Sequence, residues 1–224
     1  MSALNETALR DEMCRLGSSL FARGLSFGSA GNISVRLDDG GYLITPTEAC
    51  LGFLDPARLA RLDADVQPIS GDRASKTIAL HVRIYAAARK TDRDTSCVIH
   101  THSTHCVALT LQHPGPELIP PVAPYFVMKV GHVPVIPYHR PGAPAAVDAV
   151  AHAIEQYAAA GTPVRSVMLE RLGPNVWHDT PSAAMATLEE LEETARLLCL
   201  AHEMPALLSP GEIDELRTTF GARW

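Results

Sequence analysis

The 224-residue sequence has no run of 18 uncharged apolar residues, and its first eleven residues lack a basic stretch followed by an apolar one. From these absences we expect neither a transmembrane span nor a secretory signal peptide in this sequence. Basic residues are fewer than acidic ones, 19 lysines and arginines against 25 aspartates and glutamates, for a net charge of −6. We therefore expect neither nucleic acid nor a membrane as partner, although a local basic cleft for a small anion is compatible with this balance.

Closely paired cysteines are also missing, although the chain has five cysteines. This spacing predicts reduced thiols in a cytoplasmic protein rather than a disulfide framework. The composition, 46% apolar and 20% charged, excludes a disordered chain. No repeat or charge block divides the sequence, and the length fits a single domain over residues 1–224.

Hydrophobic periodicity and turn residues predict helices interleaved with strands. Helices are expected at 5–23, from Ser75 as N-cap to about 86, from 103 or 104 onward, and at 144–157, 181–198 and from Ser209. Strands are expected at 33–37, 42–45, near 62, and at 66–69, 97–102, 133–136, 164–169 and 176–177, with a proline-rich loop over 112–124. Because hairpins join several strands, we expect an α/β fold with a mixed, largely antiparallel sheet sandwiched between helices.

The histidines carry the strongest chemical signal, and there are ten of them. His100 and His102 lie two positions apart at the end of a predicted strand, so side-chain alternation places both imidazoles on one face. Two neutral imidazoles form half of a site for zinc, manganese or iron; alternatively, each is a buried histidine bonded to a backbone carbonyl. His105 falls on the first turn of the next helix, on another face, where we expect a supporting or structural role.

Three other segments contain groups that can hold an anion. The small residues around Gly31 and Asn32 allow backbone N–H groups to approach a ligand. Ser75 and Lys76 bring a hydroxyl, a cation and backbone amides together at a predicted helix start, as phosphate or carboxylate requires. Thr47 ends a strand and can form the opposite wall. Each of these patterns is also compatible with a plain turn or an ordinary helix cap.

Two further features have a chemical and an ordinary interpretation. Tyr125 lies in the predicted proline-rich segment, where a phenol can donate a proton to a developing carbanion or can simply pack, half-buried, in the core. The four glutamates at 189, 190, 192 and 193 are predicted to form the solvated face of the long helix.

Several blocks of the sequence, taken together, resemble the class II aldolase/adducin-like family. They are Ala30-Gly31-Asn32-Ile33-Ser34-Val35-Arg36, Leu43-Ile44-Thr45-Pro46-Thr47, Gly71-Asp72 leading to Ser75-Lys76, and Val98-Ile99-His100-Thr101-His102-Ser103-Thr104-His105. The resemblance spans nearly the whole chain. Within the family, the segments at 124–131, 140–142 and 191–195 are most similar to the 3-oxo-tetronate 4-phosphate decarboxylase branch.

The resemblance implies a three-layer α/β/α sandwich, commonly assembled as a homotetramer with sites between neighbouring subunits. It implies a small anionic sugar acid or sugar phosphate as substrate and cleavage of a carbon–carbon bond next to a carbonyl. It also implies a divalent metal, zinc first with manganese or iron as alternatives, held by His100 and His102. Tyr125 is implied to donate a proton across the subunit interface. Phosphate is implied to be held by Gly31, Asn32, Thr47, Ser75 and Lys76.

Two positions depart from the family's pattern. A glutamate that acts as acid/base and contacts the metal directly follows the serine–lysine pair in that pattern, where this chain has Thr77. A third metal-binding histidine precedes the late Gly-Pro pair, where this chain has Leu172. Threonine has no carboxylate and leucine no lone pair, so we expect weakened or absent metal binding and a rate lower by about 10²–10⁴ for the lost base. The candidates for a substitute ligand are His139, His178, His105 and Glu170.

Three functions are compatible with these residues. The first is a carbon–carbon lyase of the family, an aldolase or a decarboxylase, that works with a substitute ligand. The second is an enzyme with different chemistry on the same scaffold, in which His100 and His102 act as acid and base without a metal. The third is a non-catalytic member that binds an anionic sugar acid or a partner protein, since a fold does not fix a function.

Overall fold

A computed structural model describes residues 6–112 and 115–224, so the predictions at residues 1–5 and 113–114 lie outside the described residues. The described helices are α1 (Glu6–Ala22), α2 (Ile78–Ala88), α3 (Thr104–Gln112), α4 (Pro124–Lys129), α5 (Pro144–Ala159), α6 (Pro181–Leu200) and α7 (Pro210–Phe220), with short 3-10 turns at Leu51–Phe53 and Pro56–Arg58. The strands are β1 (Asn32–Arg36), β2 (Tyr42–Ile44), β3 (Ala60–Leu62), β4 (Pro68–Ser70), β5 (Cys97–His100), β6 (Val135–Ile136), β7 (Ser166–Leu169) and β8 (Gly173–His178).

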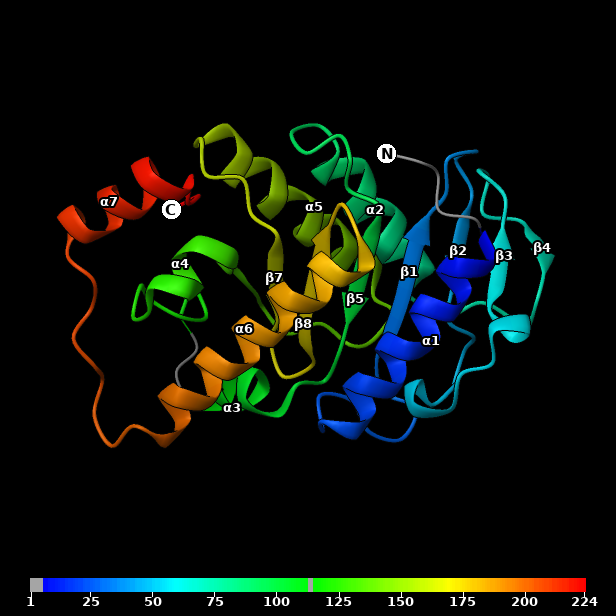
Figure 1. The fold of residues 1–224 in the computed structure, drawn as a ribbon, viewed down its shortest axis with the longest axis horizontal. Coiled ribbons are helices and arrows are strands. Elements are labelled where there is room, and N and C mark those ends of the chain that lie inside the picture. The colour runs from blue at the N-terminus through cyan, green and yellow to red at the C-terminus, as the bar shows by residue number, and fades with distance from the viewer. Residues whose placement is uncertain (1–5, 113–114) are drawn as a thin grey trace.

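These strands form one sheet in the order β4-β3-β2-β1-β5-β8-β7-β6 (Figure 1). Every neighbouring pair runs antiparallel except β6 with β7, which is parallel. The prediction of a mixed, largely antiparallel sheet is therefore confirmed. The central β1-β5-β8 ladder pairs Asn32 with His100 and His100 with Asn175, which sets three polar side chains in a row on one face.

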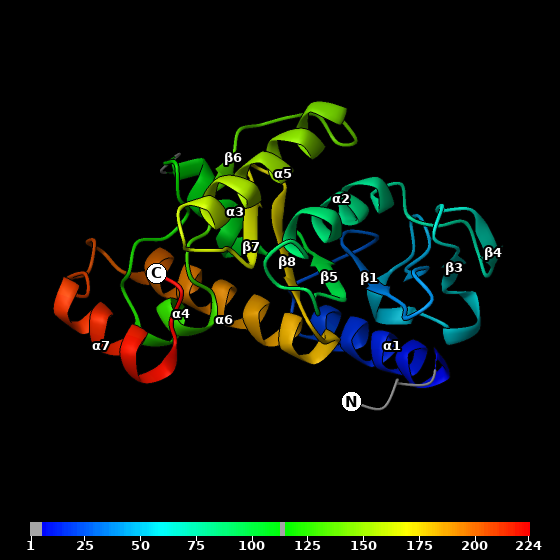
Figure 2. The ribbon, with the colours of Figure 1, turned by 90° about the horizontal axis from the view of Figure 1, so that it is seen from above.

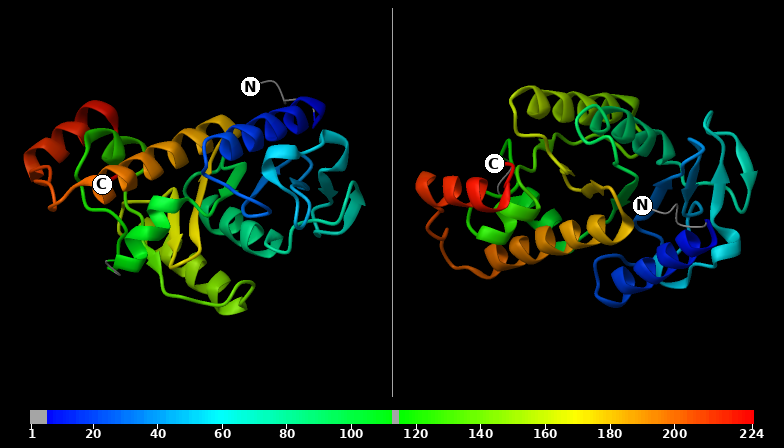
Figure 3. Two further views of the ribbon diagram at one scale, coloured as in Figure 1. Left: turned by 90° about the horizontal axis from the view of Figure 1, so that it is seen from below. Right: turned by 45° about the horizontal axis from the view of Figure 1, so that its top comes forward.

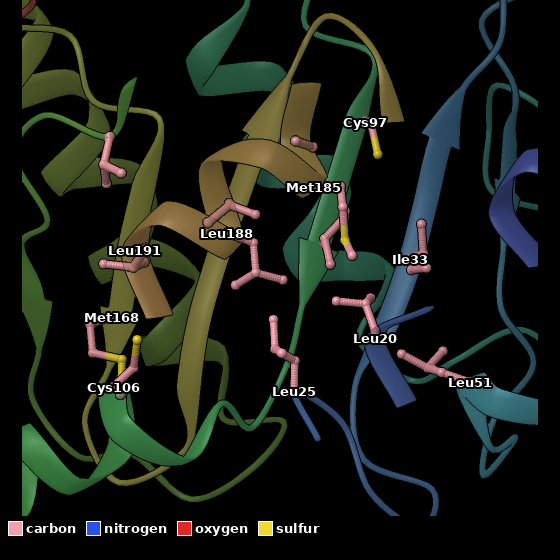
Figure 4. Packing of buried hydrophobic residues seen from close by; sticks show 14 of the residues in the cluster. Leu20, Leu25, Ile33, Leu51, Cys97, Cys106, Met168, Met185, Leu188 and Leu191 are labelled. Carbon is pink, nitrogen blue, oxygen red and sulfur yellow. The ribbon is translucent and has the colours of Figure 1, made fainter. Parts of the chain in front are cut away.

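Both faces of the sheet are apolar. Adjacent residues in its central strands are apolar, and their side chains point to opposite faces. One face, with Ile33, Ile99 and Val176, packs against α1, α3 and α6, where the facing side chains include Met13 and Leu109. Figure 4 shows Leu20, Leu188 and Leu191 in this layer, beside Ile33. The other face, with Val98 and Trp177, packs against α2 and α5. Figure 2 shows α1 and α6 along one side of the sheet and α2 and α5 along the other. The predicted three-layer α/β/α arrangement is confirmed.

Local capping signals placed some helix starts well and others badly. Ser209 and Glu212 form the capping box expected for α7, and the Thr180 side chain accepts from the Ala183 N–H at the start of α6. Ser75 is not an N-cap: α2 begins three residues later, after Thr77, whose side chain makes no capping bond. Residue 124 opens the six-residue helix α4, so Tyr125 lies on a helix and not in a loop.

The C-terminal segment crosses to the far end of the molecule, where α7 lies beside α4 (Figure 3). The chain end is fixed there by Arg223, whose guanidinium pairs with Asp92, and by Trp224, whose ring stacks on His132 with centroids 4.2 Å apart. None of the helices in the described ranges has the length and apolar character that a membrane crossing requires.

Candidate active site

A pocket of about 290 Å³ lies at one edge of the sheet, where β5 ends and β1 and β8 begin. Its walls come from the turn before β1, the segment before α2, the loop between β6 and α5, and the β7–β8 turn. His100 and His102 both line it, with ring centroids 5.1 Å apart at an interplanar angle of 67°. The expectation that the two imidazoles lie together beside a pocket therefore agrees with the geometry.

The His100 ring is held in one tautomer by its backbone partner. Its Nδ1 lies 2.9 Å from the Pro174 carbonyl, which can only accept, so Nδ1–H donates and Nε2 keeps a free lone pair. Burial, with a smaller contribution from His102, lowers the pKa of His100 to about 4. Burial likewise lowers the pKa of His102. Both rings are neutral at pH 7, which is the form that binds a metal ion.

Behind the pair lies a set of buried polar atoms that lack partners in the described structure. They are Asn32 Oδ1, His81 Nε2 and both amide atoms of Asn175. His81, on α2, is fixed through Nδ1 at 2.7 Å from the Ser34 hydroxyl, and burial lowers its pKa to about 3. Unsatisfied buried polar groups are costly and cluster at functional sites. Asn32 lines the pocket itself, whereas His81 and Asn175 do not.

The predicted anion-binding residues fall on the same pocket, with one exception. Gly31, Asn32, Ser75 and Lys76 all line it. Gly31 has a φ of 87°, and a Cβ there would come 2.9 Å from the His100 carbonyl oxygen, so only glycine fits beside the histidine strand. Thr47 does not line the pocket, although the next residue, Glu48, does.

Both departures from the family's pattern face the pocket. Thr77 lines it beside Ser75, with the two hydroxyl oxygens 2.9 Å apart, and no carboxylate occupies that position. Leu172 lines it from the β7–β8 turn. In the described part of the chain, no group of three or more histidine, cysteine, aspartate or glutamate side chains is arranged to hold a metal ion. The pair thus matches a divalent metal in donor type, but it is one protein ligand short of a usual zinc site.

The structure separates the four candidates for a substitute ligand. His139 and Glu170 line the pocket, and the Glu170 carboxylate already accepts from the Tyr138 N–H at 2.9 Å. His105 lies elsewhere, with Nδ1 2.8 Å from Glu192. His178 pairs with Cys97 at the opposite end of the β5–β8 ladder from His100, so the fold does not bring it to the pair.

Tyr125 is also outside the pocket within a single chain. It lies on α4 with 59% of its surface exposed, and the Lys129 ammonium sits 5.7 Å from its ring centroid. An exposed tyrosine is available to a neighbouring molecule, and the implied role across a subunit interface stays a prediction.

Sequence reasoning missed two charged residues of the pocket and misplaced a third elsewhere. Glu48 and Arg140 line the pocket. No motif marked Glu48, and Arg140 was noted only within the 140–142 segment that resembles the decarboxylase branch. Glu192 was expected on a solvated helix face, but it is only 8% exposed. Its carboxylate accepts from the backbone N–H groups of His105 and Cys106 at 3.0 Å, so it caps α3 from across the layer.

Comparison with known proteins gives four results that agree with this geometry. Residues 11–199 match the family described as Class II Aldolase and Adducin N-terminal domain. The chain is 52% identical to the 3-oxo-tetronate 4-phosphate decarboxylase of Cupriavidus necator, over 98% of this chain and 99% of that protein. It is 32% identical to the L-fuculose phosphate aldolase of Methanococcus vannielii, over 56% of this chain and 66% of that one. The solved structure of YgbL from Escherichia coli superposes with a TM-score of 0.83 at 40% identity, over 95% of this chain and 99% of the other.

Proposed function

The chain belongs to the class II aldolase and adducin family, and from that membership and the pocket geometry we propose that it cleaves a carbon–carbon bond in a small sugar acid or sugar phosphate. The reaction is a decarboxylation or an aldol cleavage next to a carbonyl. The observation that carries this proposal is the pair of neutral imidazoles, His100 and His102, lining one pocket with Ser75 and Lys76. A relative that is 52% identical along its full length is named as a decarboxylase, which supports the choice of reaction.

In this proposal the chain positions an anionic substrate between two sets of groups. The Lys76 ammonium and the Ser75 hydroxyl hold its anionic end, together with backbone N–H groups near Gly31 and the Asn32 amide. His100 and His102 lie on the other side, toward the reacting carbonyl. The apolar wall, which includes Leu172, limits the water that reaches this space.

His100 and His102 would hold a divalent metal, and zinc is our first choice because neutral imidazole is a favoured zinc ligand. When bound, such an ion supplies positive charge that stabilises the negative charge developing on the substrate oxygens. The Tyr125 hydroxyl of a neighbouring copy would donate a proton to the carbanionic carbon, so the active form is a homotetramer with sites at subunit interfaces. We further propose that the protein works in the cytoplasm, where its five thiols stay reduced.

The test is a comparison of metal content and turnover in matched histidine variants. Protein purified without chelators is analysed for zinc, manganese and iron, and is assayed for release of CO₂ or aldehyde from four-carbon 3-oxo acids. His100→Ala should lose bound metal and turnover, whereas His178→Ala, on the same sheet but at the opposite end, should retain both. Equal metal content in His100→Ala and the parent would show that the ion sits elsewhere.

Thr77 and Leu172 favour a second candidate function, because both place groups without metal-binding or acid/base capacity in the pocket. In that case the protein binds an anionic sugar acid without cleaving it. Saturable binding of such acids together with no turnover in any metal-loaded preparation would select this candidate. Turnover that is retained after complete chelation, and lost in His100→Ala and His102→Ala, would instead indicate metal-independent chemistry.

A further inference from the structure

Glu48 has an unusual backbone conformation at the edge of the active-site pocket. Its φ is 60°, in the left-handed region that residues other than glycine seldom adopt. Among the described residues, only Val66 and Arg171 share this property without being glycine. The turn holding Glu48 is fixed on both sides, because the Thr47 N–H donates to the Arg73 carbonyl and Ala49 N–H donates to that of Pro46. Glu48, an exposed residue, therefore lines the pocket from a strained backbone position.

The formal charges of the acidic and basic residues that line the pocket sum to zero. These residues are two acids, Glu48 and Glu170, and two bases, Lys76 and Arg140. Glu170 is bonded to the Tyr138 N–H and to Arg171, whereas no hydrogen bond or ion pair within the described residues engages the Glu48 carboxylate. Glu48 therefore remains available to a ligand, on the same pocket as the one lysine of the predicted anion-binding set.

A phosphate group and an ionised carboxylate repel each other at short distance. A phosphate monoester carries a charge of about −1.5 to −2 at pH 7, and its oxygens act mainly as hydrogen-bond acceptors. An ionised carboxylate also only accepts, so it repels the phosphate, and the phosphate dianion has no hydrogen to donate to it. A substrate hydroxyl, in contrast, can donate to Glu48 while a substrate carboxylate binds Lys76.

We propose that Glu48 excludes phosphate from this pocket and accepts a hydrogen bond from a substrate hydroxyl, so that the enzyme acts on an unphosphorylated, hydroxylated acid. This inference rests on the proposed lyase function for its substrate, but not for the effect of Glu48 on phosphate binding. Glu48 is thus a specificity-determining residue. The name of the 52% identical relative specifies a phosphorylated substrate. Glu48 would make this chain select an unphosphorylated one instead.

Phosphate binding can be measured without any turnover. Inorganic phosphate is titrated calorimetrically into the parent, into Glu48→Gln, which removes the charge but keeps the shape, and into Asp65→Asn as a control. Asp65 is an exposed residue of the β3–β4 turn, at the end of the β2–β3 pair away from Glu48, and its substitution makes the same change in net charge. Glu48→Gln should bind phosphate about tenfold more tightly than the parent, since a dianion and a carboxylate a few ångströms apart repel by at least that factor. Asp65→Asn should match the parent.

Turnover then tests the substrate class directly. The parent should show a higher kcat/KM for an unphosphorylated four-carbon 3-oxo acid than for its 4-phosphate, by about tenfold or more, and Glu48→Gln should reduce this preference. A parent that prefers the phosphorylated acid, or that binds phosphate as tightly as Glu48→Gln, overturns the inference. If neither acid is cleaved while phosphate binding changes as expected, the proposed function fails and the role of Glu48 stands.

Discussion

Acidification from pH 7 to pH 5 should destabilise the protein through the two neutral histidines buried under the pocket. His81 and His100 are held in sites where burial lowers the pKa to about 3 and about 4, from an ordinary value of 6.5. Each accepts a proton readily in the unfolded chain and resists one in the native protein. The unfolded state therefore binds more protons as the pH falls below 6.5, and the free energy of unfolding decreases.

The magnitude follows from these pKa values. At pH 5 the unfolded form of each group is almost fully protonated, and the native form is almost fully neutral. Linkage then gives a loss of about 2 kcal/mol per histidine between pH 7 and pH 5, or about 4 kcal/mol for the pair. Because pH 5 lies above both native pKa values, this loss is set almost wholly by the unfolded-state pKa. His102, whose pKa is also lowered, adds to it with the same sign.

Urea unfolding of chelator-treated protein at half-unit steps between pH 5 and pH 7 measures this loss. The window stays above the ordinary pKa of aspartate and glutamate, so carboxylate protonation contributes little. His81→Asn keeps a polar partner for the Ser34 hydroxyl but does not titrate, and it should remove about half of the slope. An unchanged slope in that variant, or stability that rises on acidification, would refute the assignment of buried neutral imidazoles.

Three further predictions concern single contacts and roles. Thr77→Glu combined with Leu172→His should raise zinc affinity at least about tenfold over the parent and over either single variant, because both positions line the pocket of the histidine pair; equal affinity would show that the pocket cannot direct these groups to one ion. Tyr125→Phe should lower kcat by about 10²–10⁴ while leaving circular dichroism and assembly unchanged, and a parent-like kcat would eliminate Tyr125 as the proton donor. Glu192→Gln should reduce the free energy of unfolding at pH 7 by about 1–3 kcal/mol, since the carboxylate accepts two backbone N–H groups at the start of α3; urea unfolding indistinguishable from the parent would contradict the capping role.

Much of the fold could be predicted because its signals are local. The helical spacing of Leu9, Met13 and Leu20 indicates the buried side of α1, and the structure buries all three. In β1, Ile33 and Val35 are buried as their alternation predicts, but the polar residues on the other face of that strand are buried as well. The Ser209 capping box is likewise encoded within four residues. The start of α2 was misplaced because Ser75 resembles a cap, while the bridge between Pro46 and Ala74 and the bond from the Ser75 N–H to the Thr45 carbonyl hold that segment extended. Such long-range pairing cannot be inferred from a local pattern.

The site divides in the same way. His100 and His102 could be placed together because one strand end carries both, and Gly31 because a tight approach requires glycine. Neither Glu48 nor Arg140 could be assigned to the pocket, since only the folded chain brings their turns there. Glu192 resembled a solvated residue in its helix pattern, yet the packing of α3 on α6 buries it against backbone donors. Tertiary contacts, and not sequence spacing, determine where Glu48, Arg140 and Glu192 lie.

Two pocket residues, Glu48 and Thr77, have chemistry that the packing of the fold does not require, whereas Leu172 packs against the apolar cluster on that face of the sheet. The Thr77 side chain makes no capping bond to α2, and Glu48 holds a left-handed conformation that costs about 1–2 kcal/mol. A glycine would relieve that cost, and the Glu48 carboxylate forms no bond within the described residues that would offset it. Strain without structural compensation, at the wall of a pocket, is the pattern expected when a side chain is retained for what it does to a ligand. The same pocket keeps its imidazole pair and its lysine, so the change in substrate selection that we propose depends on Glu48, beside groups that can still bind an anion.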